Sequence, residues 1–196
     1  MSDAQMMLRP ANKNDAHALA ELINYAGDGL PLHLWERMVE PGEGPWDVGR
    51  RRAKRDEGSF SYRNATVATI GDKVVACMIG SPLGDKAIPI DLEDTPAMFV
   101  PLMELENKAA GTWYLNVLAT YPEHRGNGIG VRFLAEALRS ADRTGRNGVS
   151  IVVSDANHAA RRLYEREGYR EACARPMVKD DWDNPGKNWV LLLPAA

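Results

Sequence analysis

The stretch WYLNVLATYPEHRGNGIGVRFLAEAL, residues 113–138, joins an apolar run, a loop with three glycines and an amphipathic pattern. The β-branched and aromatic residues of 113–120 predict a buried strand. After the loop, apolar residues recur at helical spacing and predict a helix. These helix positions are Val131, Leu134, Leu138 and Ala141. The stretch therefore predicts a strand, a glycine loop and a helix in direct succession.

The loop carries Arg125 followed by glycines at 126, 128 and 130. A helix start presents unpaired backbone N–H groups and the positive end of the helix dipole. Glycines let an anion approach the main chain, and an arginine adds a fixed positive charge. The spacing is neither a Rossmann fingerprint nor a P-loop, which ends in G-K-[ST]. A phosphate site is one interpretation, and a tight turn without a ligand is the other.

The R-x-x-G-x-G spacing, followed by DANHAARRLYEREGY at 155–169, resembles the GCN5-related N-acetyltransferase (GNAT) superfamily. The opening LRPANKNDAHALAELI, residues 8–23, is similar to the first strand and helix of many members. The resemblance implies an α/β (α+β) fold with a mixed, mostly antiparallel central sheet flanked by helices. It also implies that the two middle strands splay apart and admit the pantetheine arm of acetyl-CoA.

The resemblance implies an acetyl-CoA-dependent N-acetyltransferase, in which a primary amine of a small molecule or peptide attacks the thioester directly in a ternary complex. Tyr164 would be the catalytic residue that protonates the leaving thiolate, although spacing alone favours a packing role beside Leu163. Asn157 would meet the pantetheine arm, or only cap a helix. The expected cosubstrate-binding residues are Leu118, Ala119, Thr120, Arg125, Gly126, Asn127, Gly128, Ile129, Gly130, Val131, Asn157 and Tyr164.

The general base is missing from the two predicted middle strands. WYLNVLA has no carboxylate, and VSIVVS offers only Ser150 and Ser154, with Val152 where some relatives carry glutamate. A water chain, Glu104, Asp155 or an amine that arrives neutral could each serve. This gap leaves a second function open, namely a catalytically inactive CoA-binding sensor or interaction module with the same fold.

The resemblance also implies that the acceptor side lies at the linker GDGLPLHLW, residues 27–35. Its apolar residues Leu30, Leu32 and Trp35 suggest a wall of the acceptor site, and Asp28 could pair with an ammonium group. The alternative is that this apolar loop packs on the core.

Composition narrows the function classes. The chain has 196 residues, 44% of them hydrophobic, with a net charge of −3, and we expect one domain over residues 1–196. This charge argues against general binding to nucleic acid or anionic membranes, and the arginine-rich run 50–57 is expected to be mostly solvated. No targeting or membrane-spanning pattern is apparent, so a cytoplasmic location is expected. Two distant cysteines and four scattered histidines predict neither a disulfide framework nor a metal site.

The rest of the chain is expected to alternate between strands and helices. The C-terminal run NWVLLLPA is apolar and, with the resemblance, suggests a homodimer that pairs through the last strands. The expected strands are 6–11, 64–70, 73–83, 149–154, 169–179 and 188–195, and the expected helices are 16–26, 34–40, 45–58, a segment near Pro101, and 157–168.

Overall fold

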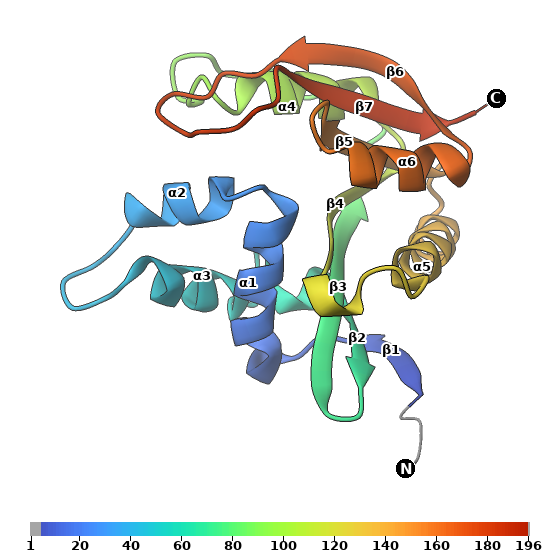
Figure 1. The fold of residues 1–196 in the computed structure, drawn as a ribbon. Helices are drawn as coiled ribbons and strands as arrows, with labels where there is room; N and C mark the ends of the chain where they lie inside the picture. The colour runs from blue at the N-terminus through green and yellow to red at the C-terminus, as the bar shows by residue number, and fades with distance from the viewer. Residues whose placement is uncertain (1–4, 196) are drawn as a thin grey trace. The chain divides into compact units, whose positions relative to one another are not determined.

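The computed structural model describes residues 5–195 (Figure 1). Within that range there are seven strands and six α-helices, joined by short 3-10 turns. The strands are β1 (Met6–Pro10), β2 (Ala65–Ile70), β3 (Lys73–Pro82), β4 (Trp113–Thr120), β5 (Val149–Ser154), β6 (Tyr169–Pro176) and β7 (Asn188–Pro194). The helices are α1 (Ala16–Ala26), α2 (Leu30–Glu36), α3 (Pro45–Ala53), α4 (Val100–Lys108), α5 (Ile129–Arg143) and α6 (His158–Arg166).

The strands follow the order β1-β2-β3-β4-β5-β7-β6 in one sheet. The pairs β1–β2, β2–β3, β5–β7 and β6–β7 are antiparallel. Strands β4 and β5 run parallel, with Trp113, Tyr114 and Leu115 opposite residues 149–151. A mixed and mostly antiparallel sheet is therefore confirmed, whereas the splay of the middle strands stays a prediction.

The chain forms two compact units. The first takes the residues up to Gly80 together with Val117–Phe133, and the second takes Ser81–Asn116 together with the residues from Leu134 onward. Each unit has an apolar core of its own. That residues 1–196 act as one domain remains a prediction from length.

In the first unit, α1 and α3 pack on β2 and β3 around a core that includes Leu19, Val67 and Ile79. The Arg9 guanidinium donates a bidentate pair of hydrogen bonds to the Asp15 carboxylate, both with N–O distances of 2.8 Å. This contact fixes the start of α1. Helices α2 and α3 lie close together because Gly49 has no side chain. A Cβ there would come within 2.5 Å of the Trp35 ring.

In the second unit, α4 packs on β5, β6 and β7, and α6 packs on β6 (Figure 1). Leu105 and Ala109 of this unit form a buried cluster with Leu191 of β7. The apolar residues of β7 are thus covered by their own chain. The exposed apolar strand that suggested a homodimer is therefore not what the structure shows, and a dimer stays a prediction from the resemblance.

The strand predictions are correct to within a few residues, but several helix predictions need correction. The helix expected at 34–40 ends at Glu36, and the helix expected at 45–58 ends at Ala53. The linker 27–35 is not a loop, because α2 begins at Leu30, directly after Gly29 adopts a left-handed φ of 86°. On α5, Leu138 is 44% exposed, whereas Phe133 and Ala137 are fully buried. Leu134 and Ala141 are buried as predicted, so the buried stripe of α5 is shifted only in part from the predicted one. Among the described residues, no helix is long and apolar enough to cross a membrane.

Candidate functional site

The C-terminal end of β4 lies in the first unit and alternates in burial. Val117 and Ala119 are buried and belong to the core beneath α1. Leu118 and Thr120, which point to the other face of the strand, are half-buried. The strand-end positions expected to meet the acyl group thus present one partly open face.

The glycine loop follows within a few residues. A 3-10 turn over Pro122–His124 leads to Arg125, and α5 begins at Ile129. Gly126 and Gly128 have left-handed φ values of 80° and 72°, and a Cβ on either would meet nothing within 4 Å. Glycine is therefore required by the backbone conformation, and the space beside it is open.

Backbone N–H groups gather at this loop. The first backbone amides of α5, those of Ile129, Gly130 and Val131, have no carbonyl oxygen of the same helix one turn earlier to which they could donate. The Asn127 side chain donates to the carbonyl oxygens of His124 and Arg125, at 3.1 and 3.4 Å, and so holds the loop on itself. The result is an exposed helix N-terminus on a 15-residue helix, suited to a phosphate group.

Arg125 and Asp28 bring opposite charges to the same unit. Arg125 Nε donates to the carbonyl oxygen of Thr120 at 3.1 Å. Asp28 follows α1 with a φ of 49°, a conformation that non-glycine residues seldom adopt. Desolvation raises the pKa of the Asp28 carboxyl, and attraction to Arg125 offsets part of that rise.

A tyrosine–carboxylate pair lies directly after β4, and sequence reasoning missed it. The Tyr121 hydroxyl donates a short hydrogen bond to Glu21 of α1, 100 residues away in the sequence. Desolvation raises the pKa of Tyr121, and the bond to Glu21 raises it further. Both residues lie in stretches that carry the resemblance, but no spacing in the sequence links them, so only the tertiary contact could reveal the pair.

In the second unit, Tyr164 lies on α6 and is 5% exposed, whereas Leu163 is half-buried. The alternative that made Leu163 the main core residue is therefore wrong. The Tyr164 ring makes an edge contact with Tyr169, with 6.4 Å between ring centroids. Burial raises the pKa of Tyr164 above its usual value. Its hydroxyl therefore stays protonated at neutral pH and is able to donate.

Asn157 caps α6 as the sequence predicts. Its side-chain oxygen accepts from the backbone N–H of Ala160 at 3.1 Å. The cap uses the oxygen of the amide only, so its nitrogen could still meet a ligand.

The side chains considered as bases are bound elsewhere. Asp155 accepts from the backbone N–H groups of Lys187 and Asn188, at 2.8 and 3.0 Å. Although burial opposes it, these bonds hold the pKa of Asp155 below its usual value. Glu104 forms an ion pair with Arg175. Ser150 shares a buried 2.7 Å hydrogen bond with Thr112, and both positions are closed to solvent.

The expected apolar wall of the acceptor site is corrected by the structure. Trp35 and Leu30 are only 4% and 9% exposed, and Leu32 packs against the core of the first unit. These side chains hold α2 in place, because an amphipathic helix buries its apolar residues. The core-packing alternative is the correct one.

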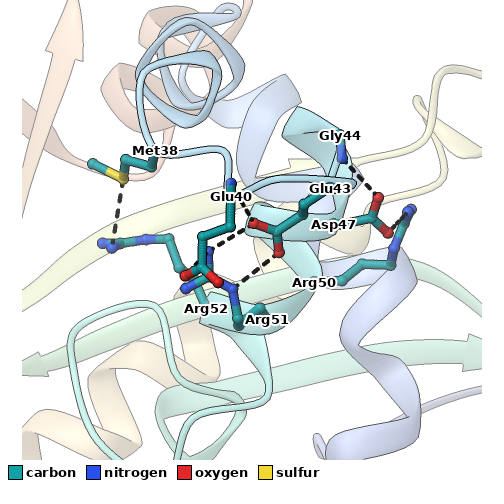
Figure 2. A network of polar contacts seen from close by, with 8 residues as sticks. All are labelled: Met38, Glu40, Glu43, Gly44, Asp47, Arg50, Arg51 and Arg52. Atoms are coloured by element: carbon teal, nitrogen blue, oxygen red, sulfur yellow. Dashed lines mark hydrogen bonds and ion pairs between the residues drawn. The ribbon is translucent and has the colours of Figure 1, made fainter.

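Two residues of the arginine-rich run pair with carboxylates, and Arg52 contacts the Met38 sulfur (Figure 2). Arg50 binds Asp47 at 2.6 Å, and Arg51 binds Glu43 at 2.9 Å. Asp47 also accepts from the N–H of Gly44 at the start of α3. The run is partly solvated, as expected, and two of its arginines are paired, so Arg125, which lies in the glycine loop, is the better anion ligand. Among residues 5–195, no group of three His, Cys, Asp or Glu side chains could hold a metal ion.

The site residues divide between the units. Leu118 through Val131 lie together in the first unit, and Asn157 and Tyr164 lie in the second. A strand end, a glycine loop and a helix N-terminus, in that order, are the features that the sequence resemblance requires.

Comparison with solved structures shows the same fold in other proteins. An N-acetyltransferase from Staphylococcus aureus Mu50 superposes with a TM-score of 0.63 at 17% identity, covering 95% of this chain and 98% of that one. A protein solved as an acetyltransferase gives 0.64 at 20% identity, covering 95% and 97%. The NatC complex, solved with Gag peptide and CoA bound, gives 0.54 at 16% identity, covering 98% and 99%. No curated protein matches the sequence.

These structures share the fold, and a family model identifies the chain more directly. The model described as the acetyltransferase (GNAT) family matches residues 32–169, which include β4, the glycine loop, α5 and α6. The chain belongs to the GNAT family of acetyltransferases.

Proposed function

We propose that this protein transfers the acetyl group of acetyl-CoA to a primary amine of a small molecule or peptide. The observation that carries the proposal is the loop between β4 and α5. Two left-handed glycines with open space beside them, the free amides of a helix start and Arg125 offer the groups that a pyrophosphate needs. The NatC complex, which shares the fold and was solved with CoA bound, is consistent with this use of the loop.

The loop residues Arg125–Val131 would hold the pyrophosphate, and the backbone of Leu118–Thr120 would meet the pantetheine arm and the thioester. The amine nitrogen attacks the thioester carbon, a C–N bond forms and the C–S bond breaks. A backbone N–H at the strand end would stabilise the oxyanion that develops. Asn157 would bind the pantetheine arm, and the Tyr164 hydroxyl would give its proton to the departing sulfur.

Asp28 is the candidate for binding the acceptor as an ammonium ion. Its carboxylate lies in the same unit as the loop, in a backbone conformation that is costly for a non-glycine residue. Such strain is concentrated at functional positions. A homodimer is part of the proposal on the strength of the resemblance, and a cytoplasmic location is part of it because the sequence shows no targeting pattern.

The first test is thermal unfolding with and without acetyl-CoA, followed by thiol release from acetyl-CoA with spermidine, phenethylamine and a short peptide with a free amino terminus. We expect a higher melting temperature with acetyl-CoA, because a ligand that binds only the folded state stabilises it. Thiol release with one amine class then names the acceptor. Stabilisation without thiol release would instead identify a CoA-binding sensor. If acetyl-CoA neither raises the melting temperature nor releases its thiol with any amine, the proposal is refuted.

A further inference from the structure

The transfer reaction needs a group that takes a proton from the acceptor amine, and the two middle strands supply no carboxylate. The first unit supplies one from another element. Glu21 of α1 accepts a hydrogen bond from the hydroxyl of Tyr121, the residue that follows β4. Tyr121 is itself anchored, because its backbone N–H donates to the carbonyl oxygen of Val75 at 3.0 Å.

The residues of α1 around this pair lie on one helix face. His17, Glu21 and Tyr25 are each four residues apart, a spacing that aligns side chains along a helix. His17 Nε2 lies 3.4 Å from the second carboxylate oxygen of Glu21. The Tyr25 ring makes an edge contact with the Tyr121 ring, with 6.0 Å between centroids. Glu21 is thus held by Tyr121 on one oxygen and His17 on the other.

We infer that Tyr121 and Glu21 form the proton-accepting pair for the amine, an inference that rests on the proposed function. The amine gives a proton to the Tyr121 oxygen as the Tyr121 hydroxyl proton passes to Glu21. Glu21 then releases this proton to water, because its side chain is 36% exposed. The proton count balances, and both side chains return to their starting states.

The surroundings of the pair suit this role. Burial of Tyr121 raises its pKa, so the hydroxyl keeps its proton and donates to Glu21 at rest. Tyr25 of α1 and Cys77 of β3 are further ionisable groups near Tyr121. Complete burial raises the pKa of the Cys77 thiol well above the usual value. Arg50 of α3 lies 3.4 Å from His17 Nδ1. A guanidinium only donates, which leaves Nε2–H of a neutral His17 to donate to Glu21.

The experiment compares Tyr121→Phe, Glu21→Gln and the double variant, using the amine that gives most thiol release. Values of kcat/KM are measured from about pH 6 to above the amine's own pKa of about 10. We expect each single variant to lose about 10²-fold near neutral pH, a typical contribution of a general base. The loss should shrink to a few-fold where the amine arrives already neutral.

The double variant should lose no more than the worse single variant, because two groups that pass one proton act as a unit. Tyr25→Phe is the matched control. It keeps the ring contact with Tyr121 and removes a hydroxyl that the proposed pair does not use, so its profile should match that of the unmodified protein. Acetyl-CoA affinity should stay the same in all four variants. The melting temperature should stay the same in Tyr25→Phe and fall in the variants that lose the hydrogen bond between Tyr121 and Glu21.

Three outcomes would overturn the inference. A loss of equal size at every pH would mean that the pair only supports the structure. Additive losses would mean that the two residues do not pass one proton. Full activity in Glu21→Gln would show that the carboxylate is not used. If the unmodified protein binds acetyl-CoA but releases no thiol with any amine, the proposed transfer fails first and the pair with it.

Discussion

Arg125 reaches back five residues and donates from Nε to the carbonyl oxygen of Thr120, across 3.1 Å. This bond ties the glycine loop to the end of β4, the two parts of the first unit that the proposed function uses together. Because Nε is occupied, the two terminal NH₂ groups of the guanidinium remain as the donors that could meet a phosphate.

Arg125→Ala should weaken acetyl-CoA binding by about 10- to 100-fold, because a hydrogen bond to a charged group contributes about 1.5–3 kcal/mol. It should also reduce the dependence of that affinity on salt. Calorimetric titration at two salt concentrations measures both effects. Arg63→Ala removes the same charge from an exposed residue that pairs with Asp56, and should leave the affinity unchanged. Equal acetyl-CoA affinities for the two variants would show that Arg125 does not bind the ligand.

Gly128→Ala should abolish most acetyl-CoA binding, since the added methyl group enters the open space beside the loop. The left-handed φ also makes alanine unfavourable there, by about 1–2 kcal/mol. Gly145→Ala controls for this strain. Gly145 follows the other end of α5, has a φ of 65° and likewise meets nothing within 4 Å. Both variants should lose similar stability in urea, and only Gly128→Ala should lose the ligand.

Tyr164→Phe should lower kcat by about 10²-fold or more while acetyl-CoA affinity is kept, because a proton donor acts on the chemical step. The neighbouring Tyr169 supplies the control. Its hydroxyl is buried without a hydrogen-bond partner among the described residues. Tyr169→Phe should therefore keep full activity and melt at the same or a higher temperature. Steady-state kinetics measure kcat for both variants. An unchanged kcat in Tyr164→Phe would show that Tyr164 has only a structural role.

Asp15→Asn should lower the free energy of unfolding at pH 7 by about 1–3 kcal/mol, since it breaks the paired contact with Arg9. Burial by itself would raise the pKa of Asp15, but hydrogen bonds from Arg9 and Asn12 outweigh it and the net pKa is lowered. A lowered pKa in the folded state stabilises above the unfolded value of about 3.9, and this contribution disappears as the pH falls through the folded value.

The difference between Asp15→Asn and the unmodified protein should therefore narrow as the pH is lowered below about 4. Urea unfolding of both proteins at pH 7 and again below about pH 4 measures this difference in the free energy of unfolding. Asp72→Asn, at an exposed turn, makes the same charge change without a buried contact and should have little effect at either pH. A constant difference for Asp15→Asn would show that the carboxylate is not the stabilising group.

The sequence by itself determined the strands, the glycine loop and the cap of α6, because each depends on neighbouring residues. The run 113–120 is β-branched and apolar, Gly126 and Gly128 occupy conformations that glycine favours, and Asn157 bonds three residues ahead. The same local patterns carried the resemblance, and with it the family and the expected acetyl-CoA loop.

Only the tertiary structure decided which side chains meet across long stretches of chain. Leu30 and Trp35 look the same in the sequence whether they line a site or fill a core, and packing within the first unit buried them both. The bond from Tyr121 to Glu21 joins residues 100 positions apart. No local pattern encodes such a contact, because it exists only after α1 has packed beside the end of β4.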